Sequence, residues 1–323
     1  MSGRAWRPAL LIGIAAALLL VGQMLLPGFL GAGQLANQVK IAAFLGLFGL
    51  CQTVVIAAGG QGLDLSVGAV ATLGGVLGAA VTGNAAMPLG GANAAMPLGG
   101  AAACLAGLLV GAVNGLGVAV LGIPPLVATL AVASVVNGGL IIGVSLFRPA
   151  DAASPALVWL AGRTTGGVPN VVVLWAAVAA VAVWLLSRSA WGRRLCGPGA
   201  SPIVALLSGT RVRAVRVAAY ALSGLLAAFS GFLLTGYVGQ AFLGLGNAYV
   251  LTSIVVAAIG GVALTGGRAP YAGVAAAAVM LTVLVSLLTA MNIGEAGRQV
   301  TFGATLLAFL ALDRIMAGRP NGP

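Results

Sequence analysis

The stretch RSAWGRRLCGPGASPIVALLSGTRVRAVR, residues 188–216, contains six arginines in a chain of which only 6% of the residues are charged. Long apolar runs precede and follow it. Loops between membrane spans that are rich in Lys and Arg remain on the cytosolic side of the membrane. The stretch therefore predicts a membrane protein with a basic cytosolic loop at residues 188–216.

A short apolar helix is predicted inside this loop. Ser201 can cap its N-terminus, Pro202 suits its first position and Gly209 can close its end. Isolated helices shorter than about 12 residues are marginal in water, so we expect a cytosolic partner to cover this one and to move the membrane channel. The predicted contact residues are Ser201, Pro202, Ile203, Val204, Leu206, Leu207, Ser208 and Gly209.

Composition predicts that the rest of the chain is embedded in a membrane. Hydrophobic residues make up 61% of the 323 residues, whereas soluble domains are about one half apolar. A membrane-spanning helix needs about 20 apolar residues. We predict ten spans, at residues 9–26, 40–58, 64–82, 101–122, 125–146, 168–186, 214–238, 249–265, 271–290 and 299–316. These spans fill almost the whole chain, so residues 1–323 are predicted to form one all-α transmembrane domain.

The distribution of basic residues supports a total of ten membrane spans. With ten spans and both termini in the cytosol, eleven basic residues face the cytosol and four, Lys40, Arg148, Arg163 and Arg298, face outward. If residues 40–82 crossed only once, the basic loop would face outward, against the usual charge asymmetry. The net charge of +11 is therefore assigned to topology and anionic lipid headgroups, not to binding of nucleic acid.

The chain contains few residues of the types that enzymes use for catalysis. It has no histidine and four acids, Asp64, Asp151, Glu295 and Asp313, which leaves few metal sites or acid–base schemes. The nucleotide-binding pattern GxxxxGK[ST] does not occur in the sequence. We predict no catalytic residue, no metal site and no bound cofactor, and we expect any ATP and Mg²⁺ in a partner subunit.

Asp64 lies in the segment GGQGLDLSVGAV, residues 59–70, whose glycines break a helix. Its carboxylate can cap the next helix by accepting a hydrogen bond from the Ser66 or Val67 amide. An acid in or near the membrane is also a functional candidate, and both interpretations remain open. Most polar residues inside the spans are expected to bond between helices, and a minority to line a solute path. The candidates for that path are Asp64, Ser66, Asn114, Thr129, Asn137 and Thr252.

A perfect tandem repeat follows the third predicted span, with NAAMPLGGA at Asn84–Ala92 and again at Asn93–Ala101. Its proline and paired glycines are turn formers. Exposed loop tips tolerate insertions. We therefore expect a duplication within an outer loop that has little effect on function.

Five segments carry a resemblance to a known family. They are GLDLSVGAV at 62–70, GAVNGLGVAVLGIPPLVATLAV at 111–132, LSG at 207–209, YALSGLLAAFSG at 220–231 and AIGGVALTGGRAPYAG at 258–273. With these segments in this order, the chain resembles the permease subunit of bacterial ABC sugar importers of the ribose/xylose/arabinose/galactose type.

The resemblance implies a multi-pass protein of the bacterial inner membrane that passes a small solute, most commonly a monosaccharide, to the cytosol. It implies a second permease, as a homodimer or a paired heterodimer, two cytosolic ATPase subunits that hydrolyse ATP, and an extracytoplasmic solute-binding protein. On this view Pro202–Ser208 is the coupling helix that docks on an ATPase.

The chain departs from the family pattern at two places. Family members usually carry an Asn-Glu-Ala-Ala-like run where this chain has Ser201–Val204, and acids at the positions of Val250 and Thr252. The predicted coupling surface is less polar than usual, which would suit a member that works beside a second, non-identical permease. The identity of the solute and of the second permease stays open.

Three alternatives are weighed against this interpretation. An ion-coupled secondary transporter needs intramembrane acids or histidines as relays, and the chain offers only Asp64, since Asp313 lies beside Arg314 at the cytosolic end of its span. A vitamin B12/siderophore-type ABC permease has a similar length and number of spans, but the DLSVG segment argues against it. An intramembrane enzyme would lack suitable acids and histidines. Uptake that survives an uncoupler but not ATP depletion would separate the ABC importers from the ion-coupled carrier.

Overall fold

The computed structural model describes residues 6–86, 88–147 and 152–317, and most of these are helical. The helices are α1 (Trp6–Leu25), α2 (Ala32–Ala57), α3 (Val67–Ala86), α4 (Ala92–Ala119), α5 (Pro125–Phe147), α6 (Pro155–Gly162), α7 (Asn170–Arg188), α8 (Ala190–Ala200), α9 (Pro202–Leu207), α10 (Val212–Val238), α11 (Tyr249–Ile259), α12 (Tyr271–Ala290) and α13 (Glu295–Ala317). Strands β1 (Thr164–Thr165) and β2 (Val168–Pro169) pair antiparallel in a small hairpin. The prediction of an all-α membrane protein is confirmed.

Within the part of the chain that the structure describes, eight helices are long and apolar enough to cross a membrane, namely α1, α2, α3, α4, α5, α7, α10 and α12. The span predicted at residues 249–265 is not one continuous helix, because α11 ends at Ile259. Its 11 residues extend only about 16 Å, roughly half the thickness of a bilayer core. The chain turns at Gly260, where a β-carbon would lie 2.5 Å from Cα of Val274 in α12. This close approach to α12 explains the glycine at the turn.

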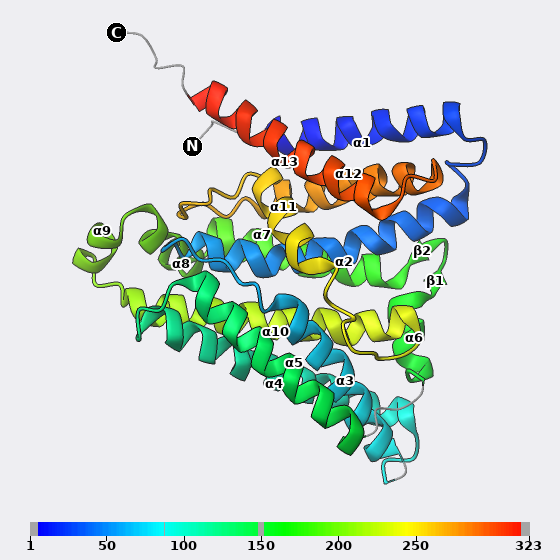
Figure 1. Cartoon of the computed structure of the whole chain (residues 1–323), viewed down its shortest axis with the longest axis horizontal. Helices are drawn as coiled ribbons and strands as arrows, with labels where there is room; N and C mark the ends of the chain where they lie inside the picture. The colour runs from blue at the N-terminus through cyan, green and yellow to red at the C-terminus, as the bar shows by residue number, and fades with distance from the viewer. Residues whose placement is uncertain (1–5, 87, 148–151, 318–323) are drawn as a thin grey trace.

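Different short elements lie at the two ends of the molecule. Figure 1 shows α8 and α9 at the end where α1 begins and α13 finishes, while α6 and the β1–β2 hairpin lie at the opposite end. Helix α8 was not predicted, because its sequence, AWGRRLCGPGA, has three glycines and an internal proline, Pro198. Ser189 caps it by accepting a hydrogen bond from the Gly192 amide. The basic loop is therefore two short capped helices joined end to end.

Helices α3, α4 and α10 pack through glycines. A β-carbon on Gly107 of α4 would lie 2.3 Å from the carbonyl oxygen of Gly224 in α10, and one on Gly111 would lie 2.2 Å from that of Tyr220. On α3, Gly74 approaches the backbone of Ala228 in the same way. Small residues allow such close contact where lipid supplies no hydrophobic drive between helices, so the glycine spacing in α4 reflects packing.

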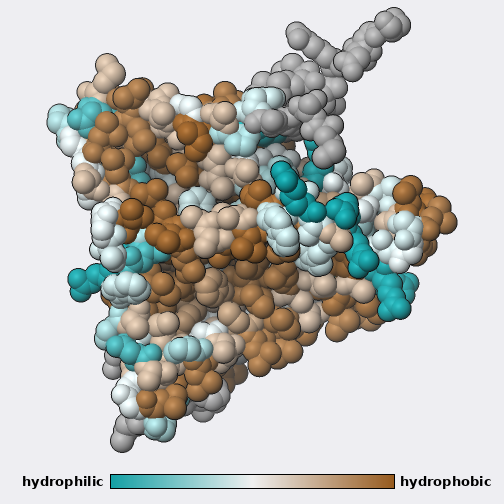
Figure 2. Space-filling model, turned by 180° about the vertical axis from the view of Figure 1, so that it is seen from behind, coloured by the Kyte–Doolittle hydropathy of each residue, from teal (hydrophilic) through white to brown (hydrophobic). Residues whose placement is uncertain are grey.

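Large apolar side chains cover much of the outer surface. Exposed examples include Met24 of α1, Leu121 after α4 and Val135 of α5. Figure 2 shows wide apolar areas over the middle of one face, with hydrophilic residues gathered toward its two margins. A surface with this distribution fits a bilayer core between two polar headgroup layers.

Candidate functional site

Helix α9 begins and ends as its sequence predicts. The Ser201 hydroxyl accepts a hydrogen bond from the Val204 amide, and Pro202 occupies the first helical position. The helix stops at Leu207, and Gly209 follows in the left-handed region with φ +79°. The cap, proline and terminating glycine are confirmed.

Four large apolar side chains of α9 face outward. Ile203, Val204, Leu206 and Leu207, here called the α9 patch, are between 63% and 83% exposed. Of the six residues of the helix only Ala205 is buried. Burying an exposed side chain of this size stabilises a complex by about 1.5–3 kcal/mol, and Figure 1 shows α9 projecting from one end of the molecule. The α9 patch is a suitable surface for a partner protein.

A junction of glycines ties the base of α9 to the membrane helices. A β-carbon on Gly199, at the end of α8, would lie 2.2 Å from the amide nitrogen of Gly267 and 2.4 Å from the carbonyl oxygen of Ala57. One on Gly59 would lie 2.4 Å from Cα of Gly199, and one on Gly266 would lie 2.6 Å from Cα of Gly59. The Gly267 amide donates to the Ala57 carbonyl across 3.0 Å. The end of α8, the end of α2 and the loop before α12 therefore touch backbone to backbone.

Asp64 is almost completely buried between α2 and α3. Its Oδ1 accepts hydrogen bonds from the Ser66 amide, at 3.0 Å, and from the Ser66 hydroxyl, at 2.6 Å. Its Oδ2 accepts from the Ser223 hydroxyl of α10 at 2.9 Å. The predicted capping bond is present, and the bond to Ser223 additionally ties this turn to α10.

Two further candidates for the solute path join the same cluster. The Asn114 amide of α4 donates to the Ser66 hydroxyl at 2.8 Å, and the Thr129 hydroxyl of α5 accepts from the Leu65 amide at 3.2 Å. Both side chains are fully buried. The side-chain amide of Gln52 in α2 donates to the backbone carbonyl of Asp64. This Asp64 cluster is a buried polar network that fixes five segments of the chain.

The remaining two candidates lie elsewhere. Asn137 is exposed on α5. Thr252 of α11 borders an open groove of about 1160 Å³ between α2, α11, α12 and α13. The six residues predicted to line a path therefore do not form one site.

The α2–α13 groove, as we name this opening, is apolar along its walls and polar at intervals. Its polar lining residues are Gln34, Asn37, Gln38, Asn247, Thr252, Thr282, Ser286, Thr289, Glu295, Arg298 and Gln299. The side-chain amides of Gln34 and Gln38 both donate to the Ser286 hydroxyl, each at 3.0 Å. The Gln38 carbonyl oxygen and the Thr282 hydroxyl are buried without a hydrogen-bond partner in the described part of the chain.

An ion pair lies at one end of this groove. The Arg298 guanidinium bonds to the Glu295 carboxylate, and the Gln299 amide donates to the same carboxylate. These hydrogen bonds lower the pKa of Glu295 below its ordinary value, so the side chain is ionised at neutral pH. The sequence placed both residues outside the membrane and gave no sign that they border the groove.

The sequence model of one protein family matches residues 34–310, and that family is described as the permease component of branched-chain amino acid transport systems. The chain belongs to this permease family. No solved structure matches the permease.

The curated relatives of the permease are transport proteins. The galactose/methyl galactoside import permease protein of Escherichia coli K12 is 30% identical over 226 residues, which cover 67% of this chain and 66% of the relative. A probable ABC transporter permease protein of Sinorhizobium fredii is 31% identical, covering 80% of this chain and 75% of the relative. The fructose import permease protein of Rhizobium meliloti is 28% identical, covering 81% and 72%. The resemblance to sugar ABC importer permeases is confirmed, and the protein is a multi-pass inner-membrane permease.

Proposed function

We propose that the permease forms the membrane channel of an ATP-binding-cassette importer and passes a small solute, a monosaccharide, from an extracytoplasmic binding protein to the cytosol. The proposal includes a second permease and two cytosolic ATPase subunits that hydrolyse ATP. The observation that carries it is the α9 patch, a capped helix with four exposed apolar side chains on a basic loop. The import permeases among its relatives support the choice of solute, although the aligned region spans only 66% of the galactose permeases.

The glycine junction supports a coupling role for α9. Because Gly199 contacts the backbone of both Ala57 and Gly267, a displacement of α8 and α9 presses directly on α2 and on the loop before α12. Helix α2 and helix α12, which follows that loop, both line the α2–α13 groove. A partner that moves α9 would therefore act on the walls of the groove through backbone contacts alone.

We place the solute path in the α2–α13 groove, with Thr252 among its lining residues. The groove is large enough for a small ligand, since such sites measure about 300–1,000 Å³, and polar side chains line it at intervals. It is open on one side, which a second permease would close. Asp64, Ser66, Asn114 and Thr129 then act indirectly, by fixing the helices around the path.

We also propose ten crossings with both termini in the cytosol. The short helix α11 and the chain before it together make one crossing, and α13 makes the last. This topology places α8 and α9 on the cytosolic side with most of the arginines, as the charge asymmetry of membrane loops favours.

The coupling role is tested with a charge placed in the α9 patch. Leu207 is 83% exposed, so Leu207→Asp leaves the fold of the permease intact, but it places an unpaired charge in a contact with the ATPase. That change costs several kcal/mol when the contact is buried. We expect loss of ATPase copurification and of ATP hydrolysis stimulated by the binding protein, with a normal amount of permease in the membrane.

The matched control is Val168→Asp, which introduces the same charge at an exposed apolar residue of β2, at the opposite end of the molecule. It is expected to retain the ATPase subunits. If Leu207→Asp also retains them and transports normally, α9 is a plain surface segment and the importer proposal loses its structural support.

A further inference from the structure

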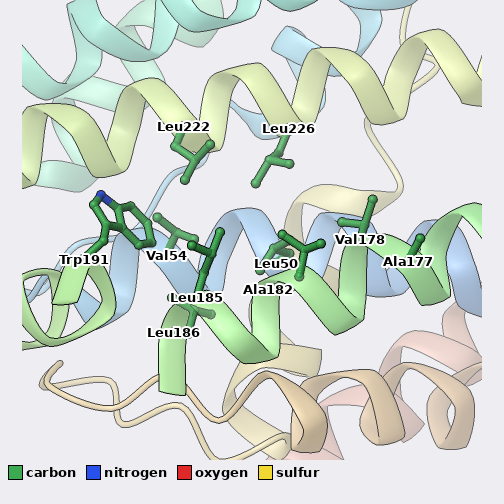
Figure 3. Close-up of a pocket in the computed structure, with 11 residues that line it drawn as sticks. Leu50, Val54, Ala177, Val178, Ala182, Leu185, Leu186, Trp191, Leu222 and Leu226 are labelled. Atoms are coloured by element: carbon green, nitrogen blue, oxygen red, sulfur yellow. The ribbon is translucent and has the colours of Figure 1, made fainter. Parts of the chain in front are cut away.

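Two cavities meet at Trp191, between α7, α8 and α10. The first, here the apolar slot, has a volume of about 310 Å³, and its walls include Val178, Ala182 and Leu185 of α7 and Leu222 and Leu226 of α10. All of its lining residues are apolar. Figure 3 shows Leu222 and Leu226 directed from α10 toward α7, with Trp191 at one end of the slot.

The second cavity, here the basic pocket, has a volume of about 460 Å³ and shares Trp191 with the slot. Its lining includes the exposed side chains of Arg194 in α8 and Arg211 just before α10. Within the described residues neither guanidinium has a hydrogen bond or ion pair, and the sequence between Arg188 and Arg216 contains no acid. The pocket therefore presents two uncompensated positive charges.

One face of α10 joins the two cavities. Arg211, Val215, Ala218, Leu222 and Leu226 follow one another at spacings of three or four residues, which place them on the same side of the helix. From Ala218 to Leu226 the helix rises about 12 Å, which is close to the roughly 15 Å depth of one leaflet of the hydrocarbon core. Trp191 lies where the basic and apolar parts meet, the position that Trp favours at a membrane interface.

We propose that the basic pocket and the apolar slot together bind one anionic phospholipid of the cytosolic leaflet. Its phosphate lies between Arg194 and Arg211, and an acyl chain lies in the slot between α7 and α10. An anionic lipid has a charged group and an apolar chain in the same order as the site. An ATPase surface would fit the basic pocket but would leave the apolar slot uncovered. The assignment to the cytosolic leaflet rests on the topology proposed above, whereas the site itself needs only the membrane location of the permease, and its test does not depend on transport.

Brominated lipids provide the test, because bromine quenches a nearby tryptophan. The full permease chain is placed in phosphatidylcholine nanodiscs that contain a small fraction of either brominated phosphatidylglycerol or brominated phosphatidylcholine. The contribution of Trp191 is the difference between the unchanged chain and Trp191→Phe, which leaves the other four tryptophans in place. We expect the anionic lipid to quench Trp191 at a much lower mole fraction than the zwitterionic lipid.

Charge variants locate the phosphate. Each arginine near the membrane surface contributes a factor of about five to the preference for an anionic lipid. The double variant Arg194→Gln/Arg211→Gln is therefore expected to lower this preference about 25-fold. The matched control is Arg213→Gln, which removes an exposed arginine of the same loop outside the basic pocket and is expected to leave the preference nearly unchanged. An equal effect of the control would show a diffuse attraction without a site, which would overturn the proposal.

Size variants locate the acyl chain. Val181→Phe narrows the slot and is expected to weaken quenching of Trp191, whereas Val173→Phe, the same exchange at an equally exposed position of α7 outside the slot, is expected to have no effect. Equal quenching by both lipids in the unchanged chain would overturn the proposal. So would a double arginine variant that loses ATPase binding but keeps its lipid preference, because the basic pocket would then belong to the ATPase.

Discussion

Asp64 accepts hydrogen bonds from two serines that lie far apart in the sequence, Ser66 and Ser223. Asp64→Asn keeps the shape of the side chain but replaces one acceptor oxygen with a donor group. We expect this change to lower the free energy of unfolding by about 1.5–3 kcal/mol, as for loss of a hydrogen bond to a charged group. Thermal unfolding in detergent measures the loss, and ATP hydrolysis per folded complex is expected to stay normal.

Ser223→Ala provides the control at this scale, because it removes only the bond between α10 and the carboxylate. It should destabilise by about 1 kcal/mol. If Asp64→Asn unfolds normally but abolishes stimulated ATP hydrolysis, the carboxylate acts on the solute, contrary to the structural role argued here. The sequence predicted the local bond to Ser66 from helix-capping rules. It could not predict the bond to Ser223, because a separation of 159 residues is closed only by the packing of α10 on α3.

At the scale of helices, we expect a large side chain at Thr252 to block solute uptake. Its side chain borders the α2–α13 groove from α11, so Thr252→Trp would fill part of the opening. We expect solute uptake in proteoliposomes to fall to the background of empty liposomes, while the permease and its ATPase subunits still assemble. The control is Asn137→Trp on the exposed face of α5, which should transport normally. Normal uptake by Thr252→Trp would move the path out of the groove.

The tandem repeat shows that local sequence alone does not determine secondary structure here. The prediction of an outer loop is wrong for the second copy, Asn93–Ala101, because all of it lies in α4. There Gly99 packs against α3, where its β-carbon would meet Thr82 Oγ1 at 2.1 Å. In the first copy Gly90 and Gly91 have positive φ and form the turn before α4. Identical residues thus take two conformations, and contact with α3 decides which copy becomes helical.

For the whole molecule, apolar length and arginine placement predicted the fold class and most spans. They did not predict that α11 would stop at Ile259, since residues 260–265 are as apolar as a helix requires. The break depends on how closely Gly260 packs against α12, which is a property of the assembled bundle. The same limit applies to the α2–α13 groove, whose lining residues come from four helices.

Topology is tested by labelling at α9. Ser208 is exposed beside the α9 patch, so Ser208→Cys in a chain without Cys51, Cys104 and Cys196 presents one accessible thiol. Gly199 is unsuitable for this purpose, because any side chain there meets backbone atoms. We expect an impermeant maleimide to label Ser208→Cys in inside-out vesicles and not in intact cells. Labelling from outside would overturn the ten-crossing topology.

The glycine junction also bears on how this permease can evolve. Gly59, Gly199 and Gly266 belong to three separate segments. A β-carbon on any one of them would lie within 2.8 Å of a backbone atom of another. Any missense change at one of them adds at least a β-carbon, and no substitution at the other two can make room, since they have no side chain to shorten. Compensation would require the backbone itself to shift. Descendants of this permease can therefore vary the α9 patch to suit a new partner while the three glycines beneath it stay constant.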